Sequence, residues 1–178
     1  MSDRKEIEEI RGEMDLLERI MNYIPGYRGY KEKELRRESD RLVRMKATSS
    51  LRSAKDLLRR NLTNPTIVRK ISSEDAWRIN ALLSRLDRVV QRVDRAVAGY
   101  AGMFDAVRVR EDKLDSVLQH DLSLIERVEA FRVSVESLVK LEPGGEGWRK
   151  EIDELLVRVE ELDSILDKRT EIIRGLVK

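Results

Sequence analysis

The sequence contains no cysteine, three prolines, one histidine and only eight aromatic side chains among its 178 residues. The absence of cysteine excludes disulfides, thiolate chemistry and cysteine-ligated metal sites. No stretch approaches about 18 uninterrupted apolar residues, so no membrane-spanning segment is predicted. The first thirty residues are charged and lack an export signal, which predicts a cytoplasmic protein.

Charged and aliphatic residues are abundant instead. Asp, Glu, Lys and Arg make up 39 % of the chain, and together with Leu, Val and Ile they give the composition of helical bundles and coiled coils. The length suits one domain that spans residues 1–178. Abundant Arg and Glu without cysteine also favour a thermophilic source.

Apolar residues recur at alternating intervals of three and four positions, which is the spacing of a helix with one buried face. The pattern divides the chain into five helical segments and predicts an all-α, coiled-coil-like fold, an elongated antiparallel bundle of four to five helices. The first segment, residues 3–24, has a narrow seam that suits either packing on the bundle or projection from it to pair with another chain, as in a homo-oligomer. That seam consists of Ile7, Ile10, Met14, Leu17, Met21 and Ile24.

Turn and capping residues separate the later helices. The second helix is expected to stop before Asn64 and Pro65, because proline cannot continue a helix. Ser72 and Asp75 have the spacing of a capping box at the start of the third helix. A turn at residues 143–147, Pro-Gly-Gly-Glu-Gly, precedes the last helix.

Two short glycine–aromatic segments, called elbows here, interrupt the helices at residues 25–30 (Pro-Gly-Tyr-Arg-Gly-Tyr) and 99–105 (Gly-Tyr-Ala-Gly-Met-Phe-Asp). Five of the eight aromatic residues lie in or beside them. Glycine permits the bend and an aromatic ring can close the end of a bundle, so the elbows are predicted to be structural corners. The alternative is a recognition corner that contacts a partner. Its candidate contact residues are Tyr27, Arg28, Tyr30, Tyr100 and Phe104.

The elbow motifs, of the form IPGYxGY and GYxGxFDA, resemble those of a family of small prokaryotic all-helical proteins without an assigned activity. The resemblance covers residues 24–125. Beyond the second elbow it includes Leu114 and the pair Asp121-Leu122. It implies a helical fold and no particular chemistry.

The second helix, residues 31–62, has two contrasting sides. Ala47, Ser50 and Ala54 are predicted to face the core, where their small size lets a neighbouring helix approach closely. Six cations fall within one sector of about 80° on a helical wheel. This basic stripe consists of Arg37, Arg41, Arg44, Arg52, Lys55 and Arg59.

The basic stripe has two interpretations. Its cations could bind the phosphates of RNA, DNA or an anionic surface. Alternatively they form a solvated face, or a face paired with the acidic fourth and fifth helices, because residues 31–70 carry a net charge of +8 and residues 111–178 carry −6. The stripe lacks interleaved aromatic residues, so single-stranded nucleic acid is not favoured.

The fourth helix carries Asp121 at a position where the seam would otherwise be apolar. A buried aspartate there is expected to pair with an arginine and to specify helix register rather than to act as a catalytic acid. Arg28, Arg37 and Arg41 are candidate partners. His120 is the sole histidine and has no accompanying nucleophile, so a surface or capping role is expected. With one histidine the chain also lacks the paired Glu-x-x-His motifs of di-iron bundles, which excludes that class of metal site. An oxygen-only site for Mg²⁺ or Ca²⁺ is an alternative, but the acidic residues fall mostly on solvent positions, so no metal or other cofactor is predicted.

Together these features predict a non-enzymatic helical interaction or scaffold protein. Its expected partner is a protein, which includes a second copy of the chain. The alternative is binding to nucleic acid or another polyanion through the basic stripe. An enzyme or small-ligand site that uses Asp121, His120 and the elbow tyrosines is the third interpretation.

Overall fold

The computed structural model describes residues 16, 18–24, 32–95 and 111–174. Both elbows lie outside these residues, together with the partner-contact candidates Tyr27, Arg28, Tyr30, Tyr100 and Phe104. Among the described residues every regular element is a helix, which confirms the all-α prediction. In the same part of the chain, no helix is long and apolar enough to cross a membrane.

Four long helices build the bundle: α2 (Glu32–Leu62), α4 (Ser73–Arg95), α5 (Glu111–Leu138) and α6 (Glu146–Arg174). A short helix that the apolar spacing did not predict, α3 (Pro65–Val68), lies between α2 and α4. It forms because Pro65 occupies the first helical turn and the Asn64 side chain accepts a hydrogen bond from the Thr66 amide, at 3.0 Å.

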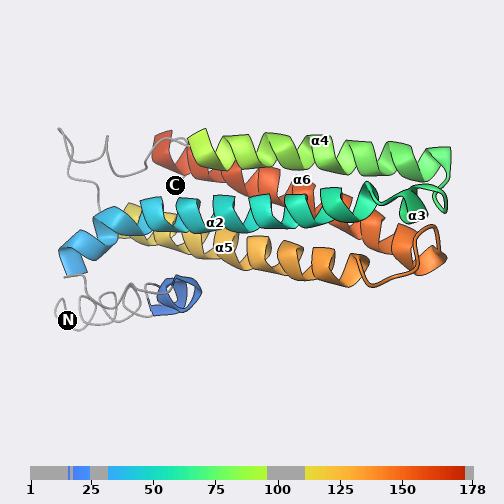
Figure 1. Cartoon of the computed structure of the whole chain (residues 1–178). Coiled ribbons are helices and arrows are strands. Elements are labelled where there is room, and N and C mark those ends of the chain that lie inside the picture. The colour runs from blue at the N-terminus through green and yellow to red at the C-terminus, as the bar shows by residue number, and fades with distance from the viewer. Residues whose placement is uncertain (1–15, 17, 25–31, 96–110, 175–178) are drawn as a thin grey trace.

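The long helices form two hairpins, α2 with α4 and α5 with α6, that pack side by side (Figure 1). α2 contacts α4 and α5, and α6 contacts the same two helices, so the four form a ring around the core. Within each hairpin the helices are antiparallel. Between the hairpins, α2 and α5 run in the same direction, and so do α4 and α6. At 1.5 Å per residue, the long helices extend for roughly 35–45 Å.

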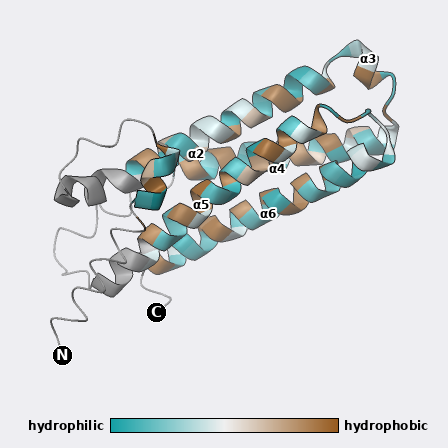
Figure 2. Ribbon diagram, turned by 90° about the horizontal axis from the view of Figure 1, so that it is seen from below, coloured by the Kyte–Doolittle hydropathy of each residue, from teal (hydrophilic) through white to brown (hydrophobic). Residues whose placement is uncertain are grey.

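The core lies along the axis of the ring, and apolar and polar residues alternate along each helix (Figure 2). On α4, Ile79, Leu82 and Leu86 follow the three-and-four spacing and are buried, and on α6 Leu155 and Leu162, seven residues apart, are buried as well. The small residues predicted to face inward on α2 are buried as well, which lets α5 approach this part of α2. They are Ala47, Ser50 and Ala54.

Part of the predicted first helix is described. Residues 18–23 are helical, and Ile20 and Ile24 belong to the hydrophobic core. Arg19 Nη2 donates to Glu126 Oε1 of α5 at 2.9 Å. These residues therefore lie against the bundle, while pairing of the first helix with another chain stays a prediction.

The end of the bundle at α3 is closed by contacts between the two hairpins. The turn before α6 places Gly144 at φ 78°, and a Cβ at this position would lie 2.6 Å from the carbonyl oxygen of Lys70. Glycine is therefore required by both the backbone angle and the close approach. Lys70 Nζ lies 3.3 Å from Glu142 Oε1, and Trp148 is fully buried near the start of α6.

Candidate functional site

The basic stripe lies on α2, and its described cations beyond Ser50 meet carboxylates of α4. Arg52 Nη2 donates to Asp94 Oδ2 at 3.1 Å. Lys55 Nζ and Arg59 Nη2 donate to the two oxygens of Asp87, at 2.6 Å and 3.1 Å. The third predicted helix thus supplies these partners, rather than the acidic fourth and fifth helices.

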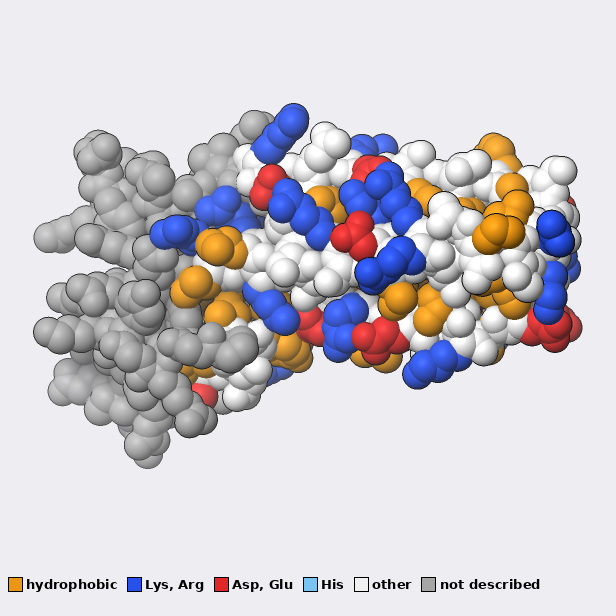
Figure 3. Space-filling model, in the orientation of Figure 1, with side chains coloured by type: hydrophobic (Ala, Val, Ile, Leu, Met, Phe, Trp, Pro, Cys, Tyr) orange, Lys and Arg blue, Asp and Glu red, His pale blue; other side chains and the backbone are white. Residues whose placement is uncertain are grey.

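The stripe is paired and yet remains accessible. The side chains of Arg52 and Arg59 are 55 % and 51 % exposed despite their ion pairs. Arg41 is exposed and Arg44 half-buried, and both have interaction partners. The side chain of Arg37 lies outside the described residues. Figure 3 shows blue cations interspersed with red carboxylates over this face of the bundle.

A second set of ion pairs, which the sequence analysis missed, joins α4 to α6. Arg78 Nη1 lies 3.3 Å from Asp153 Oδ2, and Arg88 Nη2 lies 3.0 Å from Asp163 Oδ2. Further pairs complete this arginine ladder: Arg85 with Glu160, and Arg92 with Asp163 and Asp167. The acidic charge of the last helix is therefore matched by α4.

The sequence does contain a pattern that predicts the arginine ladder, because its arginines and its carboxylates repeat with the same seven-residue period. Arg78, Arg85 and Arg92 are seven residues apart, and so are Asp153, Glu160 and Asp167. The net charge of each segment does not reveal this match. The arginines of α4 that face α6 are partly cancelled in such a sum by the carboxylates of α4 that face α2. With a seven-residue period, one side of α4 faces α6 with arginines, while Asp87 and Asp94 face α2.

Asp121 is buried, as the sequence predicts. It is fully inaccessible, and Arg169 Nε donates to its Oδ1 at 3.2 Å with an arginine side chain only 4 % exposed. Arg169, on the last helix, was not among the candidate partners that the sequence suggested. Both residues also make further interactions.

His120, next to Asp121, is half-buried. Its pKa is lowered by burial and by the positive charges of Lys168 and Arg169. The imidazole is therefore neutral near pH 7. No cluster of three or more metal-ligating side chains occurs in the described parts of the chain.

Asp75 is the second buried aspartate, and the predicted capping box is confirmed. Asp75 Oδ2 accepts from the Ser72 amide at 3.0 Å, and the Asp75 amide donates to Ser72 Oγ at 3.1 Å. Arg149 of α6 adds a bidentate contact, Nε to Oδ1 at 2.8 Å and Nη2 to Oδ2 at 3.1 Å. The hydrogen bonds from Arg149 hold the pKa of this carboxyl well below its usual range.

Glu129 occupies the seam between α2 and α5. Ser50 Oγ donates to its Oε1 at 2.8 Å and Arg132 Nε donates to its Oε2 at 2.8 Å, while Lys46 Nζ lies 3.6 Å away. Burial opposes ionisation of this carboxyl, but the hydrogen bonds from Arg132 and Ser50 and the charge of Lys46 outweigh it. The pKa of Glu129 is therefore lowered.

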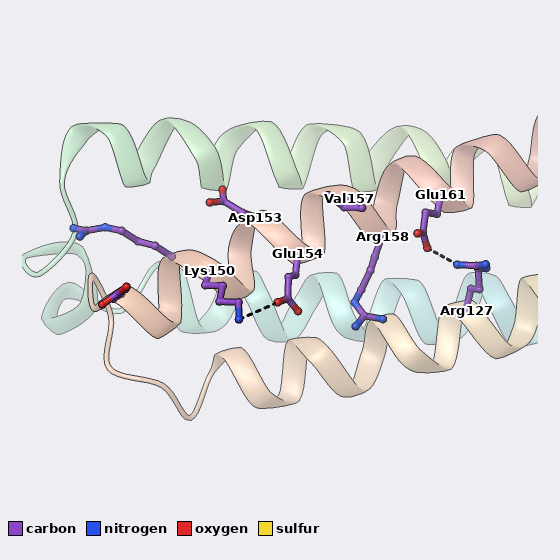
Figure 4. A pocket seen from close by; sticks show the side chains of 9 residues that line it. Arg127, Lys150, Asp153, Glu154, Val157, Arg158 and Glu161 are labelled. Carbon is purple, nitrogen blue, oxygen red and sulfur yellow. Dashed lines mark hydrogen bonds and ion pairs between the residues drawn. The ribbon is translucent and has the colours of Figure 1, made fainter.

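A groove of about 710 Å³ follows the outer face of α6, and Arg127 of α5 joins its wall (Figure 4). Asp153 lies on the side of α4, whereas Glu154 and Arg158 point toward α5. Arg127 pairs with Glu161, and a smaller groove of about 270 Å³ shares both residues. Both grooves carry charges of both signs on their walls, which suits contact with a polar surface.

Comparisons of the chain with protein-family models, curated proteins and solved structures give no match. Function is therefore inferred from the residues and their geometry.

Proposed function

We propose that this chain is a non-catalytic helical interaction protein, a scaffold that holds partner-binding surfaces in fixed positions on a rigid bundle. The expected partner is another protein, which includes a second copy of the chain.

The observation that carries the proposal is that ion pairs and hydrogen bonds join each long helix to both of its neighbours. α4 is joined to α2 through Asp87 and Asp94, and to α6 through the arginine ladder. α5 is joined to α2 through Glu129 and to α6 through Arg127. Helices joined at several heptads resist sliding, because each shift must break more than one pair. Such stiffness suits a protein that presents surfaces.

The acidic groups inside the bundle are engaged in structural contacts, which also supports a binding role. Asp75, Asp121 and Glu129 each accept a hydrogen bond from an arginine. A general base or acid must instead be able to exchange a proton with a substrate. Contacts of this kind stabilise the ionised carboxylate and lower its basicity.

Copurification tests the proposal. A tagged chain expressed at its native level should retain a partner at a fixed stoichiometry, and the same complex should form again from the two purified proteins. Tyr27→Ala and Tyr100→Ala, in the elbows, are expected to weaken that complex by about tenfold or more, as loss of aromatic contact residues does.

Val133→Ala, on the solvent side of α5, is the matched control and should leave the affinity unchanged. Circular dichroism should show the same helix content for all three variants. The proposal is wrong if light scattering shows a monomer and no partner reconstitutes with it, or if the purified chain turns over a substrate.

A second candidate function, polyanion binding, is favoured by an excess of positive charge in the basic stripe. Within the described residues, the three cations Arg52, Lys55 and Arg59 pair with two carboxylates, Asp87 and Asp94. Positive charge therefore remains after internal pairing, on side chains that are half exposed.

A salt series with a labelled RNA or DNA duplex tests this candidate. If phosphates are bound, the logarithm of the association constant should fall linearly with the logarithm of salt concentration. Arg44→Glu with Arg52→Glu should abolish binding, whereas Lys168→Glu on α6 should leave most of it. An association constant that is indifferent to salt would exclude this function.

A further inference from the structure

The end of the bundle at α3, called the tip here, exposes apolar side chains. Trp77 at the start of α4 is 70 % exposed, Val68 of α3 is 50 % exposed and Leu141 after α5 is 38 % exposed. The contacts of Lys70 with Glu142 and Gly144 bring the chain after α3 against the turn that follows Leu141. Figure 3 shows hydrophobic side chains gathered over α3 and the start of α4. Tryptophan is one of the residue types that are enriched at contact sites relative to the rest of a protein surface.

The tip also carries unbalanced positive charge. From Arg60 to Ser73 the chain has three cations, Arg60, Arg69 and Lys70, and no carboxylate. Arg60 and Arg69 are exposed, and neither makes an ion pair within the described residues. Among the described residues Lys70 pairs only with Glu142, whose side chain is 80 % exposed, and the nearby Glu74 lies 2.8 Å from Arg78, which also pairs with Asp153.

The backbone beneath the exposed residues of the tip is held by several well-defined contacts. The capping box and the Arg149 contacts fix the first turn of α4 at Asp75, two residues before Trp77. Gly144 packs against the Lys70 carbonyl directly after Arg69. The backbone that carries Trp77, Arg69 and Lys70 is therefore held in place, so little backbone entropy is lost when these residues bind.

We propose that the tip docks end-on to an anionic phospholipid surface, with Trp77 and Val68 in the interfacial layer and Arg60, Arg69 and Lys70 at the headgroup phosphates. Tryptophan favours the boundary between hydrocarbon and water, and basic residues beside an apolar anchor are attracted to anionic headgroups. This docking uses a different surface from the basic stripe and does not depend on the scaffold function.

The shape of the tip favours a lipid surface over a protein pocket. The exposed apolar residues lie at the end of an elongated bundle, and the two described grooves are lined by α5 and α6 residues, not by these side chains. A specific protein interface requires about 800 Å² from each partner. A bilayer adapts to a small convex end and needs only a few inserted side chains.

Tryptophan fluorescence of the full chain with vesicles tests the docking. The sequence has two tryptophans, Trp77 and Trp148, and Trp148 is 1 % exposed. Changes in emission and in quenching by acrylamide therefore report on Trp77. Equimolar phosphatidylcholine and phosphatidylglycerol vesicles should shift the emission to the blue and reduce quenching, whereas pure phosphatidylcholine vesicles should not. The protein should sediment with the anionic vesicles only.

Charge reversal separates the tip from general electrostatics. The double variant Arg60→Glu/Arg69→Glu should lower the vesicle partition coefficient by about tenfold or more, because each cation near the surface contributes to binding. The control Arg95→Glu/Lys168→Glu changes the net charge equally, at exposed residues toward the opposite end of α4 and α6. It should lower partitioning much less. Trp77→Ala should reduce partitioning and remove the blue shift.

Three results would overturn the proposal. The first is the absence of sedimentation with anionic vesicles at low salt. The second is sedimentation that falls equally in both double variants. The third is a Trp77 shift caused by soluble polyglutamate and not by vesicles, which would identify the tip as a docking site for an acidic protein. A positive vesicle result combined with no protein partner would leave the tip proposal standing and reject the scaffold function.

Discussion

Two buried aspartates, at opposite ends of the bundle, are each held by an arginine of α6. Asp75 lies at the α3 end, where Arg149 remains 45 % exposed. Asp121 lies toward the other end, where Arg169 is 4 % exposed. Both pairs join the α6 helix to a neighbouring helix, but only the first keeps its cation in water.

The difference in the exposure of the two arginines implies different roles. The contact at Asp75 mainly stabilises the fold, whereas the contact at Asp121 mainly specifies how two helices align. Asp75 receives a bidentate arginine and the capping hydrogen bonds of Ser72, which outweigh the desolvation of its buried carboxylate, while the guanidinium of Arg149 stays hydrated. Asp121 and Arg169 are both removed from water, and the cost of burying two charges offsets most of their attraction. We infer that the pair at Asp121 contributes mainly to the register between α5 and α6.

The largest effect is expected for Arg169→Leu, which removes one charge of the enclosed pair and leaves the Asp121 carboxylate buried. The free energy of unfolding should fall by about 3–5 kcal/mol, as measured by urea denaturation at pH 7. The reason is that the carboxylate loses the arginine hydrogen bond and cannot regain water.

The double variant Asp121→Leu/Arg169→Leu is the control for that prediction. Replacing both charges by apolar side chains should restore most of the lost stability, because neither member of the pair is then left as an unpaired buried charge. A double variant as unstable as Arg169→Leu would show that the pair provides net stability, and the contrast with Asp75 would then be lost.

Asp75→Asn should have the next largest effect. It weakens the capping box and the bidentate contact to Arg149 but leaves an amide that can still hydrogen-bond. The expected loss is about 2 kcal/mol, near the upper range for a helix cap. Ser72→Ala, which removes one half of the box, is the companion variant and should cost less; the reverse order would contradict the leading role of Arg149.

The acid stability of the protein should depend on Asp75. Its pKa is lowered in the folded chain, and an aspartate in an unfolded chain titrates near 3.9. Its contribution is therefore complete above pH 5 and is lost as the pH falls below about 4 toward the folded-state pKa. The stability difference between the wild type and Asp75→Asn should shrink between pH 7 and pH 3. A difference that is constant with pH would rule out this linkage.

The helices and the core were predictable because they depend on local spacing. The three-and-four alternation located Ile79, Leu82 and Leu86 on a buried face, and Ser72 with Asp75 marked where α4 begins. The burial of Asp121 also followed from its seam position. In each case the neighbours that decide the outcome lie within one or two turns of the same helix.

Pairing between helices was much less predictable. The arginine of Asp121 is Arg169, 48 residues later, and the partners of Arg52, Lys55 and Arg59 lie on α4, whereas the net charge of residues 111–178 had favoured the last two helices. To predict these partners one must know which helices are neighbours around the core, and the apolar spacing within each helix does not specify that order. The repeat Arg78, Arg85 and Arg92 contained the missing information, since its period matches the carboxylates of α6.

The smallest effect is expected at the surface, for Arg52→Gln. Arg52 and Asp94 are 55 % and 54 % exposed, so water already solvates both charges and little is lost when the ion pair is removed. The free energy of unfolding should change by less than about 0.5 kcal/mol in dilute salt, and the difference should vanish in about 1 M salt. Arg169→Leu should remain destabilising at the same salt concentration, because ions do not screen a pair that water cannot reach. Equal salt sensitivity of the two variants would mean that Asp121 and Arg169 are hydrated in solution, and burial would then no longer distinguish the two ends of the bundle.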